Sequence, residues 1–121
     1  MAVSIEELIS KQEEIKQKKK ELFDLTTSVG TITVKKVSPS LALEVSGMDG
    51  EDSDRYLVLN AVVSPDLKDS RLLKAYGCLE PTDILDKIFD HGEIVAISRK
   101  IMELSGFGKE IHSEVHKEAK N

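Results

Sequence analysis

The sequence predicts an α+β fold, as a mostly helical small single domain with one antiparallel β-hairpin near residues 20–37. The chain has 121 residues, 40% of them hydrophobic, which is enough for the core of one domain. Apolar and polar residues alternate with a period of two between Leu22 and Val37, as in half-buried strands. From Ser38 onward the apolar residues recur every three or four positions, as on helices.

The first expected element is an amphipathic helix over about residues 4–16, within an N-terminal segment of residues 1–17. Ser4 can cap this helix, and Glu7 stands three residues later, which is the spacing of a capping box. Aliphatic residues then recur on one face, with Gln12 as a polar exception: Ile5, Leu8, Ile9 and Ile15. Such a stripe can pack on the domain or reach a partner.

The hairpin follows this helix. Leu22 to Thr26 is expected to form its first strand, and the residues TSVG form the turn. The second strand is rich in β-branched residues between Thr31 and Val37. Because an isolated hairpin is only marginally stable in water, helices must cover its apolar face.

Four or five helices are expected to provide that cover. Ser38 and Pro39 are typical of a helix start, and Gly47 and Gly77 are typical of helix ends. An acidic loop from Asp49 to Asp54 is expected to cap the most buried of these helices. The pattern places the first three helices at residues 38–47, 54–63 and 69–77. The fourth is capped by Glu80 or Thr82 and runs to Phe89, and the fifth is capped by Asp90 or His91 and ends at Gly106.

The last two helices carry the candidate partner-binding residues. Two apolar stripes are formed by Ile84, Leu85, Ile88 and Phe89 and by Ile94, Ile97, Ile101 and Leu104. The alternative interpretation is that each stripe is core, which is the commoner role of such a pattern. These helices end a domain of residues 18–108, and residues 109–121 form a charged tail or a short helix.

The charge pattern argues against nucleic acid as a partner. The net charge is −5, and residues 44–90 carry five basic residues against eleven acidic ones. Nucleic-acid binding depends on clustered Lys and Arg, and the short basic cluster at residues 16–20 is flanked by glutamates. The sequence has no apolar run of transmembrane length, so no membrane partner is expected. A single cysteine fits a reducing cytoplasm.

Three features resemble chemical sites without completing one. Cys78 has Glu80, Asp83 and Asp86 as neighbours, which disfavour a thiolate, so a packed or half-buried thiol in a helix–helix connection is expected. The acidic loop that starts at Asp49 lacks the glycine and glutamate that a calcium-binding EF-hand requires. His112 and His116 are one helical turn apart, but no glutamate follows the first histidine. No catalytic, cofactor or metal site is expected, and the chain is not expected to be an enzyme.

The chain contains the segments GTITVKK, LKD followed by AYGC, EPTDI and GEIVAISRKIMELSGF. With the sequence around them, over roughly residues 16–108, these segments resemble the XkdN-like family of phage tail assembly chaperones. The resemblance implies a non-enzymatic protein of tailed phages and prophages that acts in the bacterial host cytoplasm. Such chaperones bind the tape measure protein, a long helical polypeptide, and recruit tail tube protein around it.

The resemblance also implies absence from the mature virion, and in many tailed phages a longer product made by programmed frameshift. A homo-oligomer is a further possibility. Two functions from other classes stay open: an acidic regulatory or adaptor module, and a structural tail component that is retained in the particle.

Overall fold

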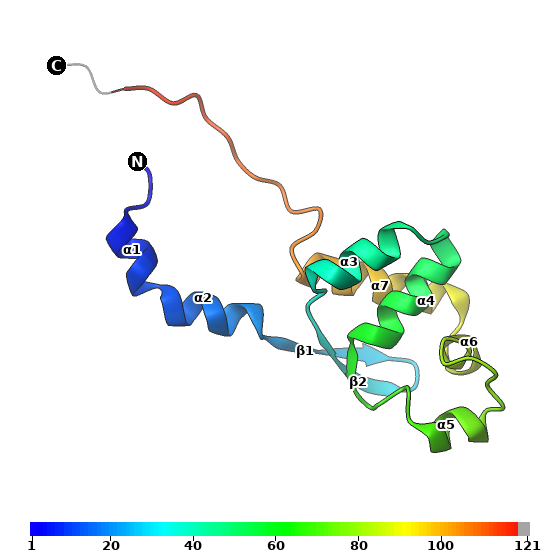
Figure 1. Ribbon diagram of the computed structural model, residues 1–121. Helices are drawn as coiled ribbons and strands as arrows, with labels where there is room; N and C mark the ends of the chain where they lie inside the picture. Colours follow the sequence, from blue (N-terminus) through cyan, green and yellow to red (C-terminus); the bar gives the residue numbers. More distant parts are fainter. Residues whose placement is uncertain (119–121) are drawn as a thin grey trace.

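The computed structural model describes residues 1–118 and has the expected α+β fold. A three-stranded antiparallel sheet is packed by helices, and Figure 1 shows how the elements are arranged. In chain order the elements are α1 (Ile5–Ser10), α2 (Gln12–Lys19), β1 (Leu22–Thr27), β2 (Gly30–Lys35), α3 (Pro39–Ser46), α4 (Gly50–Ala61), β3 (Val62–Ser64), α5 (Ser70–Ala75), α6 (Asp83–Ile88) and α7 (His91–Leu104).

The predicted hairpin is confirmed as β1 and β2. Phe23 lies opposite Val34 and Leu25 opposite Ile32, so that these four side chains share one face of the sheet. Ile32 and Val34 on that face are buried. The turn ends at Gly30, whose φ of 126° is a conformation that residues with a side chain rarely adopt.

The sheet has a third strand that the sequence did not reveal. The helix expected over residues 54–63 ends at Ala61, and Val62–Ser64 forms β3, in which Val62 lies opposite Val34 of β2. Pro65 follows this strand, and the residue before a proline disfavours helical conformation. The β-branched residues Val62 and Val63 instead belong to a strand that pairs with the edge of β2 not occupied by β1. This pairing depends on residues far away in the sequence.

Two helix boundaries also differ from the expectation. The expected acidic loop is the first turn of α4, which begins at Gly50 with Asp49 in the N-cap position. Acidic residues are favourable there because the helix dipole places partial positive charge at the N-terminus. The expected N-terminal helix is divided at Lys11 into α1 and α2, and it continues to Lys19.

Two helices have the serine caps that the sequence predicts. The Ser4 hydroxyl accepts a hydrogen bond from the backbone N–H of Glu7 at 3.1 Å. The Ser38 hydroxyl does the same for Leu41 at 3.1 Å. In contrast, Thr82 occupies the N-cap position of α6 without a side-chain cap. The carboxylate of Asp83 instead accepts hydrogen bonds from the N–H groups of Leu79 and Glu80, at 3.1 and 2.9 Å.

Two glycines end helices in the same way. Gly77 follows α5 with φ of 67°, and the N–H of Cys78 reaches back to the carbonyl of Leu73 at 2.9 Å. Gly106 follows α7 with φ of 94°, and the N–H of Phe107 reaches the carbonyl of Met102 at 3.0 Å. This is the Schellman motif, in which a left-handed residue satisfies the last helix carbonyls. Cys78 is therefore half-buried in a helix–helix connection, as expected.

The core lies between the sheet and helices α3, α4, α6 and α7. Polar contacts tie its periphery together. The hydroxyl of Ser98, which is buried on α7, donates to Asp54 on α4 at 2.7 Å. At the hairpin turn, the N–H of Ser28 donates to Glu93 of α7 at 2.8 Å. The N–H of Val37 donates to the hydroxyl of Ser105 at 2.8 Å, so the start of α7 is attached to the hairpin turn and its end to the segment that follows β2.

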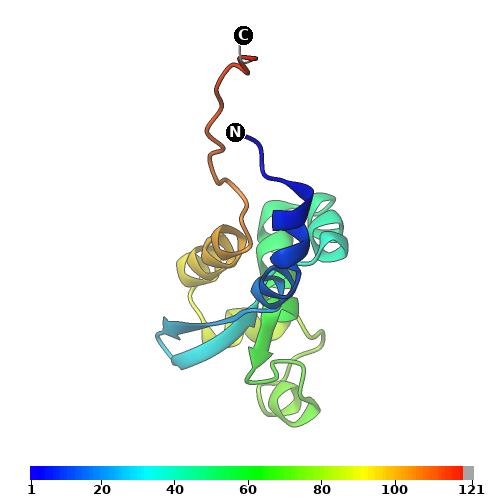
Figure 2. The same ribbon diagram turned by 90° about the vertical axis from the view of Figure 1, so that its left-hand side faces the viewer.

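The two ends of the chain extend from the domain. Figure 1 shows α1 and α2 leading away from the start of β1, and Figure 2 shows the C-terminal segment on the same side. No residue of α1 or α2 is buried. The sequence left open a tail or a short helix after residue 108, and residues 109–118 form no helix or strand. We call residues 1–21 the arm and residues 109–118 the tail.

Candidate partner-binding surfaces

The structure places most of the predicted partner-binding residues in the core. Two of the eight, Ile88 and Leu104, are half-buried. The other six are at most 5% exposed: Ile84, Leu85, Phe89, Ile94, Ile97 and Ile101. The two stripes pack against each other and against the sheet, so both helices use them to close the core. Their role as partner-binding residues stays a prediction, and in the closed domain a partner reaches only their rim.

A first groove at this rim lies between α7 and α4. Its volume is about 450 Å³, and its apolar lining comes from Val45, Leu57, Met102 and Phe107. The side chains of Asp54, Ser98, Arg99 and Glu103 also line it. Phe107, placed by the Schellman motif at the end of α7, is 47% exposed. We call this hollow the α4–α7 groove. An apolar lining with charged side chains beside it suits an amphipathic helix.

A second, smaller hollow lies between α7 and strand β1, which is at the edge of the sheet. Its volume is about 330 Å³, and Leu25, Ala96 and Ile97 provide its apolar part. Glu93 and Lys100 of α7 also line it. At one end of the hollow, Glu93 also binds the hairpin turn, because the N–H and the hydroxyl of Ser28 donate to its carboxylate.

The acidic side chains of α4 surround Arg55. This guanidinium lies 3.0 Å from Asp52, 4.0 Å from Glu51 and 3.3 Å from Asp86, so it connects α4 to α6. The hydrogen bond to Asp52 raises the pKa of Arg55 above its ordinary value. On the neighbouring residue, the hydroxyl of Tyr56 donates to Glu44 of α3, and this bond raises the pKa of Tyr56. Arg55 and Tyr56 therefore connect α4 to carboxylates on α6 and α3, respectively.

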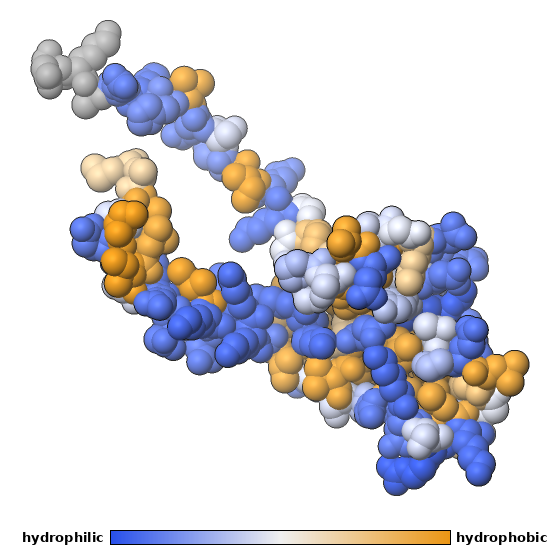
Figure 3. All heavy atoms as spheres, viewed as in Figure 1, coloured by the Kyte–Doolittle hydropathy of each residue, from blue (hydrophilic) through white to orange (hydrophobic). Residues whose placement is uncertain are grey.

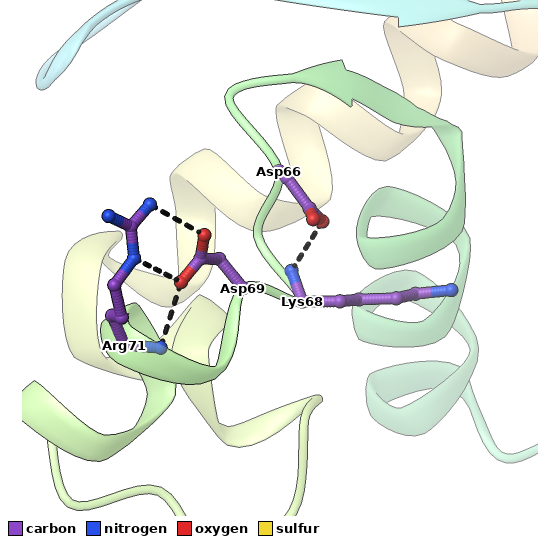
Figure 4. Close-up of polar contacts among 4 residues, drawn as sticks. All are labelled: Asp66, Lys68, Asp69 and Arg71. Carbon is purple, nitrogen blue, oxygen red and sulfur yellow. Dashed lines mark hydrogen bonds and ion pairs between the residues drawn. The ribbon is translucent and has the colours of Figure 1, made fainter.

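The loop before α5 holds another set of local polar contacts, which Figure 4 shows. Asp66 accepts from the N–H of Lys68 at 3.0 Å, and Asp69 accepts from the N–H of Arg71 at 2.8 Å. The guanidinium of Arg71 also binds Asp69, with one contact at 3.0 Å. The hydrogen bond from Arg71 lowers the pKa of Asp69 to about 2. Asp69 thus caps α5, and Asp66 stabilises the loop that leads to it.

The sites that the sequence left incomplete hold no ligand set. Within residues 1–118, no three His, Cys, Asp or Glu side chains converge on a position that could hold a metal ion. His112 lies in the extended tail, with its Nε2 atom 3.3 Å from Glu114. The helical spacing between His112 and His116 is therefore not realised in this structure.

The arm carries the largest group of unburied aliphatic residues. Figure 3 shows them as orange side chains along α1 and part of α2. Ile5 is 68% exposed and Ile9 64%, and the others are also exposed: Val3, Leu8 and Ile15. The spacing of these residues predicted the stripe but left open whether the domain would cover it. In the structure, the domain leaves the stripe exposed.

Comparison with known families matches residues 4–120 to the Phage XkdN-like tail assembly chaperone protein family. The match extends from the arm through the domain to the tail. No match was found among curated proteins or among solved structures. In the described part of the chain, each helix is too short or too polar to span a bilayer. With nearly the whole sequence matched, this chain belongs to the XkdN-like family of phage tail assembly chaperones.

Proposed function

We propose that this chaperone binds the tape measure protein of its own phage or prophage and recruits tail tube subunits around it. It does so without catalysis, in the cytoplasm of the bacterial host, and it leaves before the virion is complete. Membership of the family supports this role. The α4–α7 groove is the proposed binding surface, because it offers a helical client an apolar lining with charged side chains beside it.

The client helix lies along α7, over the α4–α7 groove. Phe107 and Met102 provide the accessible apolar contacts, and Arg99 and Glu103 provide the charges beside them. Leu104, at the end of the same helix, is half-buried and does not line the groove. Thus α7 serves two purposes: its buried stripe holds the domain together, and its outer side meets the client.

Burial of apolar surface dominates the proposed complex, because exposed ion pairs contribute little to affinity. Raising the salt concentration is therefore expected to weaken the complex only modestly. A regulatory module that bound nucleic acid through phosphate contacts would lose its affinity steeply with salt.

The test is co-expression and pull-down with the tape measure and tail tube proteins encoded by the same phage element. Phe107→Asp is expected to remove most of the captured tape measure protein. Leu43→Asp is the matched control, because Leu43 is 76% exposed on α3 and does not line the groove. Thermal melting of each variant confirms that the fold is intact.

Two results would contradict the proposal. Failure of the folded wild-type chain to bind either tail protein would remove the chaperone mechanism and favour an adaptor role. Detection of the chain in purified mature particles, by mass spectrometry at a stoichiometric level, would instead indicate a structural tail component.

A further inference from the structure

The arm is a helical segment without a cover. Residues 1–21 are exposed, apart from the half-buried Ser4. Isolated helices of this length are marginal in water even when they are well capped. The cap at Ser4 and the exposed ion pair between Glu13 and Lys16, at 3.8 Å, are too few to hold these short helices by themselves. Packing against another element would therefore stabilise the arm and remove its aliphatic stripe from water.

The charges of the arm indicate what kind of element packs against it. Residues 5–14 contain four Glu and one Lys, whereas residues 15–20 contain four Lys and no acidic residue. The arm is thus acidic at its start and basic at its end. Two such arms side by side in parallel would place like charges together, whereas in antiparallel orientation the acidic part of each faces the basic part of the other.

The centre of the stripe fits this arrangement, because Gln12 stands between Ile9 and Ile15; beyond it, Leu8 and Ile5 of one copy lie opposite the alkyl stems of Lys16 and Lys19 of the other. Gln12 is the polar residue within the stripe and lies near the middle of the arm. In an antiparallel pair that crosses at Gln12, Ile9 of one copy lies opposite Ile15 of the other, and Glu6 lies opposite Lys18. The two Gln12 amides meet at the two-fold axis, where each can donate and accept a hydrogen bond. A single polar residue inside an apolar seam is a known way to set the register of paired helices.

We propose that two copies of this chain associate through their arms, which pack antiparallel about Gln12. The contact is isologous, as a two-fold interface requires. It leaves the α4–α7 groove of each copy free, so it does not depend on the client interaction proposed above. A dimer presents two such grooves to a long helical client.

The first experiment measures the mass of the full-length chain by sedimentation equilibrium over a range of concentrations. The wild-type chain is expected to dimerise reversibly. Ile9→Asp and, independently, Ile15→Asp, which change the two residues that face each other across the seam, are expected to yield monomers whose domain melts as in the wild type. Leu43→Asp, which places the same charge on an exposed residue of the domain, is expected to dimerise normally. A monomeric wild-type chain, or a dimer that survives both arm variants, would overturn the proposal.

The orientation is tested by charge reversal at low salt. Glu6→Lys with Glu7→Lys is expected to weaken the dimer by about tenfold, and Lys18→Glu with Lys19→Glu by a similar factor. The four changes in one chain are expected to restore the dimer, because the two ends are again complementary. A parallel pair would respond weakly to each reversal, since it already places like charges together. If the variant with all four changes does not dimerise again, the antiparallel arrangement is excluded.

Discussion

The arm and the domain carry the same kind of apolar stripe, but only the domain covers it. Ile94 and Ile101 of α7 are fully buried, whereas Ile5 and Ile9 of the arm are more than 60% exposed. Both sets recur every three or four residues along their helices. Helical periodicity therefore indicates that a face exists, and the rest of the molecule determines what covers it.

This difference separates two roles. The apolar residues of the domain stabilise its fold, because burying them requires no second molecule. Those of the arm contribute to stability only when another molecule packs against them. The following experiments test that separation, beginning with the largest expected effect.

Removing part of a buried side chain should distinguish the regions most strongly. Ile94→Ala is expected to lower the free energy of unfolding by about 2–5 kcal/mol, because it leaves a cavity in a closely packed core. Ile9→Ala is expected to change the stability of the domain by less than about 0.5 kcal/mol. Urea denaturation, followed by circular dichroism, measures both. If the two substitutions lower the free energy of unfolding equally, the arm belongs to the cooperative unit of the domain.

Loss of a buried hydrogen bond should have a smaller effect within the domain. Ser98→Ala removes the donor to Asp54 between α7 and α4, at an expected cost of about 1–2 kcal/mol. Ser46→Ala is the control, because its hydroxyl donates to the carbonyl of Leu43 on an exposed part of α3. That change should stay within about 0.5 kcal/mol. Equal urea midpoints for the two variants would contradict the role assigned to Ser98.

Removing residues 1–15 should alter the domain less than either core variant. The remaining chain keeps the contact between the Lys36 ammonium and the carbonyl of Lys18, at 2.6 Å. Its unfolding free energy is expected to match that of the full-length chain, measured as a monomer at high dilution, within about 0.5 kcal/mol. Helical circular dichroism should fall by the contribution of the arm alone. A large loss of stability would show that the arm packs on the domain in solution.

The smallest effect concerns one cap at the edge of the domain. The pKa of Asp69 is lowered to about 2 by Arg71, whereas an unfolded aspartate titrates near 3.8. Because the folded pKa lies below the unfolded one, the stabilisation is complete above about pH 4 and is lost as the pH falls towards 2. Asp69→Asn keeps the cap but not the charge, so its melting temperature should fall slightly at pH 7 and approach that of the wild type near pH 2.

A pH-independent difference in melting temperature between these two proteins would contradict the role of the carboxylate charge. Asp69→Ala provides the comparison for the cap itself. Alanine accepts no hydrogen bond from the N–H of Arg71, so this variant should melt below Asp69→Asn at each pH.

Much of the fold could be predicted from short-range patterns. The hairpin around Gly30, the caps at Ser4 and Ser38, and the helix ends at Gly77 and Gly106 depend on backbone groups within a few residues. The strand β3 could not be predicted, because Val62 and Val63 continue the apolar run of a helix. Only the position of β2 beside them makes a strand the better choice.

The candidate site divides in the same way. By itself, the sequence determined which residues form apolar stripes, where helices start and stop, and how charge is distributed along the arm. The tertiary structure decided that the stripes of α6 and α7 close the core, that Phe107 and Met102 line an open groove, and that the arm stays uncovered. The reason is physical: caps and periodicity depend on neighbours along the chain, whereas burial depends on which surfaces meet in space.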